Sequence, residues 1–473
     1  MNSTQTHPLQ NNFSNGIRDH FNRKALHLAP ISIHYRRLLA QYYNNYTGAD
    51  SRVIELGCGT GELLKRLNLR VPTGIDLSEE QIKVAKQLIP QGSFIVGNAE
   101  TITLDRYFDT IILSDTLNYA GDIQLLLSNL HGFSDHNSRL IINSKNTLWA
   151  PIIRLAQKLK LKNPEPKLNW LSVNDILNLL HLANWEEITV ENRILLPLPL
   201  IGSPFNRWLA PLLKHFCLTS FIICRPQYFL TPRKEYSVTV IVPARNEAGN
   251  ICSAVERIPV MGTRSEVIFI EGNSTDNTWE EIQKNLDKRN DLTVSSMKQT
   301  GKGKANAVRE AIAKATGDVI MILDADLTVA PEDLPKFYEL LATGKAEFAN
   351  GVRLVYPMDN HAMRFLNMCA NKFFSIGFSW ILGQPVKDTL CGTKVFFRES
   401  YLDFAKDEAD LRLKDPFGDF EFLYFARQKN LKILDIPIRY HDRVYGQTNI
   451  NRWRHGWMLL KMLVYGALRF KFI

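Results

Sequence analysis

Short apolar runs alternate with helical patterns of apolar and polar positions along most of the chain, and this alternation predicts an α/β architecture. In the first half, a helix is expected at residues 31–46, followed by strands at 52–56, 71–75, 93–96, 110–114 and 139–143. Two later runs, 185–191 and 220–224, have no long helix between them. We expect these two runs to form an antiparallel pair at the edge of the sheet.

A second series of strands begins in the middle of the chain, with runs at 238–242, 266–270, 292–295 and 318–323. Before it, residues 228–235 contain a proline and end in charged residues, which predicts a linker. The first residues are rich in Asn, Ser, Thr and Gln. The expected organisation is a flexible terminus (1–30), a first α/β domain (31–227), the linker, a second α/β domain (236–450) and a basic amphipathic helix (451–473).

Composition limits the class of protein further. A chain of 473 residues has room for two or three domains, and 45% apolar with 22% charged residues excludes a disordered chain. Six scattered cysteines without a Cys-x-x-Cys pair, and a polar start, favour a cytoplasmic location. The net charge is +9, and residues 439–473 hold seven basic residues against one acid. This distribution suits an anionic membrane surface or a phosphate-bearing substrate better than nucleic acid.

The first candidate site lies at the turn after the first strand. Three glycines without side chains would let a ligand lie against the backbone there, and Glu62 argues against the dinucleotide-binding fingerprint. Asp76 ends the second strand, where a carboxylate can accept hydrogen bonds from both hydroxyls of a ribose. The alternative is a tight turn, with Asp76 capping the next helix. The turn reads Glu55-Leu56-Gly57-Cys58-Gly59-Thr60-Gly61.

Over about residues 31–225 these motifs resemble the class I S-adenosylmethionine-dependent methyltransferases. The resemblance implies a Rossmann-like fold, S-adenosyl-L-methionine as cofactor, and no catalytic base shared by the whole family. It places the glycine turn near the methionine part and Asp76 at the ribose. Asn98 stands at the adenine turn, where the family often has an acid. The implied cofactor residues are Glu55, Gly57, Gly59, Gly61, Asp76, Asn98, Ala99 and Ser114.

In the second half, three strands end in polar motifs. The first leads into Pro243-Ala244-Arg245-Asn246-Glu247, the next into Glu271 and Asp276, and the last into Asp324-Ala325-Asp326. Parallel strands present such motifs at one edge of the sheet, where ligands bind. On an extended strand end, residues i and i+2 point the same way, so Asp324 and Asp326 can hold one divalent cation. Such a cation neutralises a departing diphosphate.

From residue 236 to 465 the chain resembles glycosyltransferase family 2, whose nucleotide-sugar-binding fold is called GT-A. The resemblance implies Mg²⁺ or Mn²⁺ at Asp324 and Asp326, and inversion at the transferred sugar. The turn Gly301-Lys302-Gly303-Lys304 is similar to a glycine–lysine turn of the family, although two solvated lysines are the alternative. Glu271-Gly272 replaces the usual paired aspartates, which leaves the base of the nucleotide open. The implied nucleotide-sugar residues are Pro243, Asn246, Glu247, Glu271, Asp276 and Lys302.

Motifs around residues 351–353, 388–393 and 442–448 look most like the branch that loads sugars onto dolichyl or polyprenyl phosphate. Arg353 and Arg443 would then pair with the acceptor's phosphate, which is already ionised and requires no general base. A sugar hydroxyl as acceptor would require a base, and Asp419 or Glu421 is the candidate. The alternative for both acids is the first turn of a helix, where negative charge is favourable.

The C-terminal helix predicted at 451–473 carries apolar residues at helical spacing, interrupted by basic residues. It is either an interfacial helix on a membrane surface or a helix that packs on the core. The sequence as a whole predicts a bifunctional transferase whose two domains act on related glycan, lipid or small-molecule substrates. The competing hypotheses are a glycosyltransferase with a non-catalytic methyltransferase-like domain, and a membrane-surface scaffold with vestigial sites.

Overall fold

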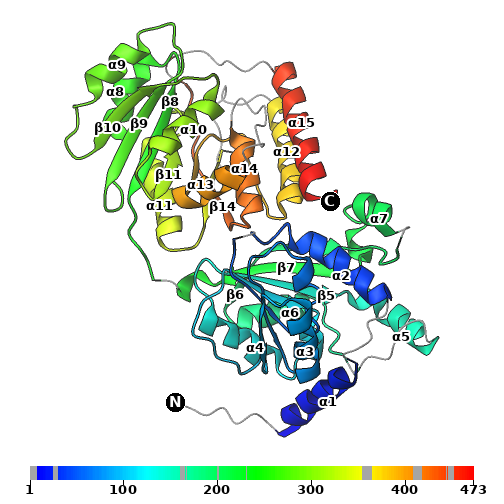
Figure 1. Ribbon diagram of the computed structural model, residues 1–473. Coiled ribbons are helices and arrows are strands. Elements are labelled where there is room, and N and C mark those ends of the chain that lie inside the picture. Colours follow the sequence, from blue (N-terminus) through cyan, green and yellow to red (C-terminus); the bar gives the residue numbers. More distant parts are fainter. Residues whose placement is uncertain are drawn as a thin grey trace. The chain divides into compact units, whose positions relative to one another are not determined.

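The computed structural model describes residues 8–24, 30–48, 50–159, 166, 168–199, 202–230, 232–353, 365–407, 418–443, 445 and 452–473. The chain divides into two compact units, residues 1–230 with 471–473, and residues 231–470 (Figure 1). Each unit is built around a seven-stranded sheet. The expected α/β fold class is therefore confirmed for both halves of the chain.

The first sheet has the order β3-β2-β1-β4-β5-β7-β6. Its first five strands are parallel, and β7 runs antiparallel to both β5 and β6. The expected antiparallel pair at the sheet edge is thus confirmed. The strands are β1 (Val53–Leu56), β2 (Thr73–Asp76), β3 (Ser93–Val96), β4 (Thr110–Ser114), β5 (Arg139–Lys145), β6 (Trp185–Arg193) and β7 (Thr219–Pro226).

Helices cover both faces of this sheet. All four residues of β1 are buried, with Val53 in one apolar core and Ile54 in the other, because successive side chains of a strand point to opposite faces. Helices α2 (Pro30–Tyr43) and α3 (Glu79–Leu88) supply the first core. Helices α4 (Ile123–Asn129) and α6 (Val173–Leu182) supply the second.

The N-terminal segment differs from the prediction. Residues 1–30 are expected to be flexible, but Pro8–Lys24 forms the helix α1. Ile17 is buried, and Phe13, Ile17 and Phe21 follow one another at helical spacing. The prediction rested on the polar composition of the first dozen residues, and the short apolar face of α1 begins only after them.

The second sheet has the order β10-β9-β8-β11-β13-β12-β14. Its first four strands in the chain are those expected, and β13 runs antiparallel to β11 and β12. The last three strands were not expected. The strands are β8 (Val238–Ala244), β9 (Ser265–Glu271), β10 (Thr293–Lys298), β11 (Val319–Ile322), β12 (Phe348–Val352), β13 (Lys394–Phe397) and β14 (Ile433–Pro437).

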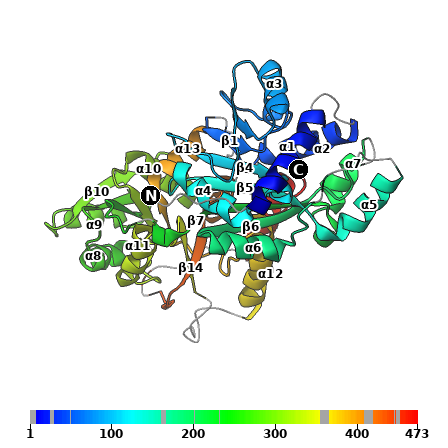
Figure 2. The same ribbon diagram turned by 90° about the horizontal axis from the view of Figure 1, so that it is seen from below.

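The helices of the second unit again form two layers. One face of the sheet packs against α8 (Ala248–Arg257), α9 (Thr278–Asn285) and α11 (Leu334–Ala342). The other face packs against α10 (Lys304–Lys314), α12 (Phe365–Leu382), α13 (Arg398–Asp407), α14 (Asp419–Gln428) and α15 (Arg452–Phe470) (Figure 1 and Figure 2).

Helix α15 confirms the expected C-terminal helix, and it has two faces. Leu459 and Met462 are buried against the core, where the Tyr424 hydroxyl donates to the Met462 carbonyl at 2.5 Å. On the other face, Trp457 is 61% exposed. The helix thus packs on the core, as one hypothesis predicts, and keeps the exposed stripe that the other requires. In the part of the chain that the structure describes, no helix is both long and apolar enough to cross a membrane.

Candidate active sites

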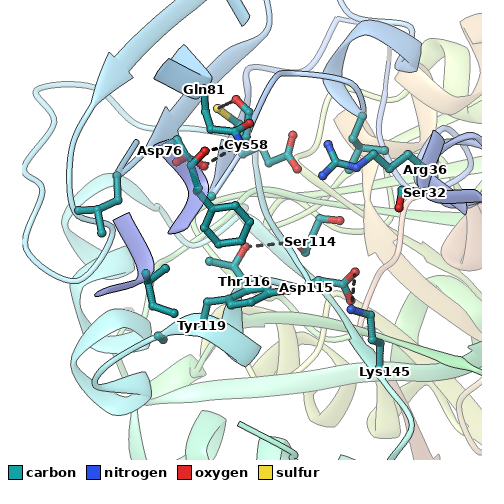
Figure 3. A pocket seen from close by; sticks show the side chains of 18 of the residues that line it. Ser32, Arg36, Cys58, Asp76, Gln81, Ser114, Asp115, Thr116, Tyr119 and Lys145 are labelled. Carbon is teal, nitrogen blue, oxygen red and sulfur yellow. Dashed lines mark hydrogen bonds and ion pairs between the residues drawn. The ribbon is translucent and has the colours of Figure 1, made fainter. Parts of the chain in front are cut away.

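A cavity of about 610 Å³ lies in the first unit at the carboxyl ends of the central strands (Figure 3). Its volume is in the range of small-molecule sites. The predicted residue Gly61 does not line it. A side chain at Gly61 would lie 3.4 Å from Ala85 and Ile89, so this glycine lets the turn pack against α3. The predicted residues that do line the cavity are Glu55, Gly57, Gly59, Asp76, Asn98, Ala99 and Ser114.

The glycine turn requires residues without side chains. Gly57 has a φ of +76°, and a side chain there would lie 2.8 Å from the Thr116 hydroxyl. Gly59 has a φ of +55°, and its amide donates to Asp76 Oδ2 at 2.8 Å. The left-handed conformation and the close approach both exclude larger residues. The turn therefore presents bare backbone to the cavity.

Asp76 is partly buried between the turn and α3. Its Oδ1 accepts from the Ser78 amide at 2.9 Å, and its Oδ2 accepts from Gly59. The N-cap of α3 is Ser78, whose hydroxyl accepts from the Gln81 amide. The alternative that Asp76 caps this helix is therefore wrong. Burial raises the pKa of Asp76, although these backbone amides act in the opposite direction.

Glu55 is a buried acid that lines the cavity. Its Oε2 has no hydrogen-bond partner among the described residues. Burial raises the pKa of Glu55 to about 8, while the charge of Arg36 opposes the shift. Arg36 comes from α2, and its guanidinium lies within 4 Å of the position that a Gly59 side chain would take. Figure 3 shows Arg36 pointing into the cavity.

Helix α1 closes part of the cavity. Asn22 Oδ1 accepts from the Ser78 hydroxyl at 2.5 Å, and the Phe21 carbonyl accepts from Gln81 Nε2 at 3.3 Å. The Phe21 ring meets Tyr119 edge to face, with centroids 5.2 Å apart. Neither α1 nor Arg36 was found from the sequence, since both lie far from the glycine motif along the chain. The apolar spacing within α1 was the available signal.

The far end of the cavity combines one ion pair with apolar walls. Asp115 Oδ1 accepts from Asn143 Nδ2 at 3.0 Å, and Lys145 Nζ lies 3.9 Å from Asp115 Oδ2 (Figure 3). The surrounding side chains are mostly apolar. They are Trp149, Ile152, Ile153, Leu196, Pro197, Leu198 and Leu218.

The second candidate site lies at the carboxyl ends of β8, β9 and β11. Arg443 bridges two acids there, with Nη2 at 2.5 Å from Asp326 Oδ2 and Nη1 at 3.1 Å from Glu247 Oε1. Lys304 Nζ lies 2.5 Å from Asp324 Oδ1. Burial raises the pKa of Glu247 to about 7, and Arg443 opposes that rise. The structure thus brings three predicted residues from distant parts of the chain together.

Backbone pairing positions Arg443. The His441 amide donates to the Thr328 carbonyl at 3.0 Å, and Val329 and Tyr440 form an antiparallel bridge. These contacts hold residues 440–443 beside the loop that carries Asp326. Parts of the predicted 442–448 motif, residues 444 and 446–448, lie outside the described residues.

The two aspartates do not project from an extended strand, so the local geometry expected for them is wrong. Strand β11 ends at Ile322, and Asp324 opens a turn in which Leu327 has a φ of +52°. Each carboxylate is held by a different cationic side chain. Within the described ranges, no cluster of three or more His, Cys, Asp or Glu side chains is arranged to hold a metal. Two carboxylates can still suffice when substrate phosphates complete the coordination.

Lys304 is the lysine of the Gly301–Lys304 turn that reaches the site, whereas Lys302 is exposed. Burial alone would lower the pKa of Lys304, but the charges of Asp324 and Asp419 raise it above its usual value. A side chain at Gly392 would collide with Asp324 and Lys304. The turn was predicted, but the lysine that pairs with Asp324 is Lys304, and the role of Lys302 toward a nucleotide sugar stays a prediction.

The remaining predicted nucleotide-sugar residues gather at the ends of β8 and β9. Asn246 Oδ1 accepts from the Thr275 amide at 2.8 Å, and Asp276 Oδ1 accepts from the Thr278 amide at 3.1 Å. Glu271 accepts from the backbone of the same loop, and Pro243 lies within β8. The contact of Asn246 joins the two loops, whereas the contacts of Asp276 and Glu271 lie within the loop after β9. Their role toward a nucleotide stays a prediction.

Arg353 donates two hydrogen bonds to the Asp388 carboxylate, from Nε to Oδ2 at 2.7 Å and from Nη2 to Oδ1 at 2.9 Å. Asp388 is fully buried. Burial alone would raise its pKa, but Arg353 lowers the pKa of Asp388 to about 2. The guanidinium of Arg353 thus already binds a carboxylate of the protein. Its role as a phosphate ligand stays a prediction.

The two candidate bases occupy the first turn of α14, as their alternative interpretation expects. Glu421 accepts from the Tyr401 hydroxyl at 2.7 Å and from Arg309 Nη1 at 2.5 Å. Residues two apart on a helix face different directions. The charge of Asp419 acts on Lys304, so Asp419 is the acid of the pair that lies toward the site.

Comparison with known proteins matches both units. The family profile described as Glycosyl transferase family 2 matches residues 239–403, and the profile described as Methyltransferase domain matches residues 48–189. These ranges contain the glycine turn of the first site and the three strand-end motifs of the second. A fused transferase enzyme is therefore shown, with a Rossmann-like methyltransferase domain before a GT-A domain.

Curated relatives support the same assignment. Glycosyltransferase AglJ of Haloferax volcanii is 30% identical over 223 residues, covering 46% of this chain and 68% of the relative. The dolichol-phosphate mannosyltransferase of Pyrococcus furiosus is 34% identical over 234 residues, covering 47% and 64%. The malonyl-[acyl-carrier protein] O-methyltransferase of Bacillus cytotoxicus is 36% identical over 103 residues, covering 20% and 36%. The chain belongs to glycosyltransferase family 2.

Proposed function

We propose that the chain is a bifunctional transferase. Its second unit transfers a sugar from a nucleotide-sugar donor to a polyprenyl or other lipid phosphate, or to a glycan. Its first unit transfers a methyl group from S-adenosyl-L-methionine to a related lipid, glycan or small molecule. The observation that carries the proposal is that two separate sites, each at the carboxyl edge of its own sheet, hold buried or partly buried charged residues from several elements.

The second site has the chemistry for a nucleotide-sugar donor. Asp324 and Asp326 would hold Mg²⁺ or Mn²⁺, because hard cations take carboxylate oxygens together with the oxygens of substrate phosphates. Bound there, the cation would neutralise the charge that develops on the departing diphosphate. Lys304 adds a positive charge beside Asp324.

Arg443 is the candidate for binding an anionic acceptor. A guanidinium recognises phosphate through a two-pronged hydrogen bond, and a phosphate nucleophile requires no base. The similarity to a relative named dolichol-phosphate mannosyltransferase supports this class of acceptor. If the acceptor is a sugar hydroxyl instead, Asp419 is the better-placed base, because its charge acts on Lys304, which pairs with Asp324.

The first site fits S-adenosyl-L-methionine. The buried Oε2 of Glu55, for which the described part of the chain offers no hydrogen-bond partner, suits the ammonium group of the methionine part, and Arg36 suits its carboxylate. Asp76 keeps lone pairs for the ribose hydroxyls, while Asn98 and Ala99 line the end expected for adenine. The cofactor would supply an electrophilic methyl group. The acceptor would lie toward Ser114 and Asp115.

We further propose peripheral attachment to the cytoplasmic face of a membrane. In the second unit, exposed apolar side chains occur on α12 at Phe373 and Ile376, and on α15 at Trp457 and Val464. Lys461 lies over the Trp457 ring, with its Nζ 5.7 Å from the ring centroid. Exposed apolar residues beside a lysine are typical of an interfacial helix.

Thermal unfolding with ligands tests both halves of the proposal. The protein is heated with UDP or GDP, with or without Mn²⁺, and with S-adenosylhomocysteine. A ligand at about 100 times its Kd adds roughly 2.7 kcal/mol to the unfolding free energy of the unit that binds it. We expect one nucleotide to stabilise only with metal, and Asp326→Asn to abolish that effect while keeping the effect of S-adenosylhomocysteine.

Two results would contradict the proposal. If no nucleotide stabilises the protein, the sugar-transfer half is wrong. If S-adenosylhomocysteine has no effect, the first unit is a non-catalytic, methyltransferase-like domain attached to a glycosyltransferase.

A further inference from the structure

The first unit carries an exposed apolar surface that neither proposed reaction explains. Two segments form it, residues 148–159 and residues 205–216. Trp149 Nε1 donates to the Phe216 carbonyl at 2.9 Å, and Asn146 Nδ2 donates to the His215 carbonyl at 3.1 Å, so the segments adjoin. Leu212 is 66% and Phe216 is 63% exposed. We call this the α5 surface; its residues are Leu148, Ile152, Leu155, Leu159, Leu212, Leu213 and Phe216.

Helix α5 (Ala150–Lys158) exposes a stripe of apolar side chains to solvent. Leu148, Ile152, Leu155 and Leu159 follow one another at spacings of four, three and four residues, so they lie along one face. All four side chains are more than half exposed. Apolar residues of a soluble helix normally face the core, and here a whole stripe faces outward. Both views show α5 and α7 (Gly202–Pro204), which directly precedes the second segment, at the same end of the first unit (Figure 1 and Figure 2).

The charged side chains of the two segments that form the α5 surface have one sign. Arg154 and Lys158 flank the stripe on α5, and Lys214 lies in the second segment; all three are exposed. The sequence contains no acidic residue between Asp135 and Glu165, nor between Glu191 and Glu235. Aspartate and glutamate make up 48 of the 473 residues, so acids are absent where the chain average would place several. The surface is therefore complementary to an anionic, partly apolar partner.

The surface is continuous with the methyl-transfer cavity. Ile152 belongs to the exposed stripe and also lines the cavity, as do its neighbours Trp149 and Ile153. The cavity wall near α5 is apolar, as described above. A molecule with a hydrophobic tail held at the α5 surface would thus meet the cavity at the end that we assign to the methyl acceptor.

We propose that the α5 surface docks the first unit on an anionic lipid bilayer, and that the methyl acceptor is a lipid-anchored molecule that enters the cavity from the bilayer. The docking rests only on the surface, whereas the acceptor class rests on the proposed methyl transfer. A second copy of the chain is a poor occupant, because two such surfaces would bring basic residues of like sign together. A bilayer rich in phosphatidylglycerol satisfies both the charge and the apolar stripe.

Amide hydrogen exchange on the full chain tests the docking locally. Exchange is measured with vesicles of phosphatidylcholine alone and with vesicles that contain about a third phosphatidylglycerol. We expect protection of residues 150–158 and 205–216 only with the anionic vesicles, and weaker protection at high salt. Protection confined to residues 452–470, or no protection in the first unit, would overturn the proposal. Because the measurement resolves segments, attachment through α15 cannot imitate docking through α5.

Substitutions in the α5 surface provide a second test of the docking. Leu155→Glu with Leu212→Glu should reduce the affinity for anionic vesicles about tenfold or more, and Arg154→Gln with Lys158→Gln should weaken it without removing any apolar residue. Val71→Glu with Leu182→Glu is the matched control, since both residues are more than half exposed in the same unit. This control should bind vesicles as the unchanged protein does. An equal loss in the control, or dimers in solution that the Leu155→Glu and Leu212→Glu variant dissociates, would refute bilayer docking.

Retained stabilisation by S-adenosylhomocysteine shows that the surface variants keep their fold and cofactor site. With that retained, the Leu155→Glu and Leu212→Glu variant should methylate lipid-extracted acceptors at least tenfold more slowly. Unchanged methylation would contradict the proposal that the methyl acceptor is lipid-anchored. It would not affect the conclusion on docking. If the unchanged protein fails to bind S-adenosylhomocysteine, the proposed methyl transfer fails, and the exchange measurement still decides whether the surface docks.

Discussion

The buried carboxyl of Glu55 should make cofactor binding depend on pH. Its pKa is about 8, so about 3% of the side chain is ionised at pH 6.5 and about 24% at pH 7.5. An ammonium group at Oε2 requires the ionised form. The affinity for S-adenosylhomocysteine should therefore rise about eightfold between these two pH values. Glu55→Gln, which does not titrate, should bind more weakly at pH 7.5 and lose this dependence.

Titration calorimetry at several pH values measures this effect. The matched control is Glu62→Gln, because Glu62 pairs with Arg66 and does not line the cavity. It should keep the eightfold change. A change of less than twofold in the unchanged protein, or an equal slope in Glu55→Gln, would refute the assignment of the ammonium group to Glu55.

The raised pKa of Glu55 also makes the unfolding free energy of the first unit depend on pH. The native first unit binds a proton at Glu55 up to a pKa of about 8, whereas the unfolded chain releases it near pH 4.5. The contribution of Glu55 to the unfolding free energy is fully present below pH 4.5 and is lost as the pH rises toward 8. Glu55→Gln should flatten this part of the stability profile in the absence of cofactor.

Three further outcomes follow from the second site. Lys304→Met should slow sugar transfer about a hundredfold by removing the charge beside Asp324, whereas Lys302→Met, in the exposed half of the same turn, should stay within about threefold in an initial-rate assay. Glu421→Gln should lower the unfolding free energy by about 1–3 kcal/mol in urea titrations, because it weakens one buried and one partly buried contact, and should leave kcat nearly unchanged. Arg443→Lys should weaken metal-dependent nucleotide binding about tenfold in thermal-shift titrations, since a lysine cannot bridge both carboxylates.

Local patterns predicted the parallel strands, because a buried central strand is a continuous apolar run between turns. Strands β12 to β14 lack this signature. Asn350 and Gly351 interrupt β12, and Lys394 begins β13 although its side chain is fully buried. Lys394 Nζ donates to Asn350 Oδ1 at 2.9 Å and to the Cys391 carbonyl at 2.8 Å. These strands depend on partners distant in sequence, which no local window contains.

The site residues also divide into those that a local motif marks and those that depend on distant parts of the chain. Residues carried by a strand-end motif, such as Asp76 and Asp326, were predicted because the motif itself places them at the sheet edge. Arg36 comes from a separate helix, so no motif marked it. Lys304 was inside a recognised motif, yet which lysine reaches the site depends on where α10 begins after Gly303, whose φ is +87°. The sequence does not display that boundary.

The central claim is that both sites transfer groups in one chain, and a double-label assay tests it most directly. The protein is incubated with S-adenosylmethionine carrying a tritiated methyl group, with radiocarbon-labelled nucleotide sugars, and with polyprenyl phosphate and other lipid and glycan acceptors. Asp76→Asn and Asp326→Asn are measured beside the unchanged chain. We expect both labels to enter acceptors, with Asp76→Asn losing only the methyl label and Asp326→Asn losing only the sugar. Incorporation of sugar without any methyl label, unaltered by Asp76→Asn, would contradict two active transferases in this chain.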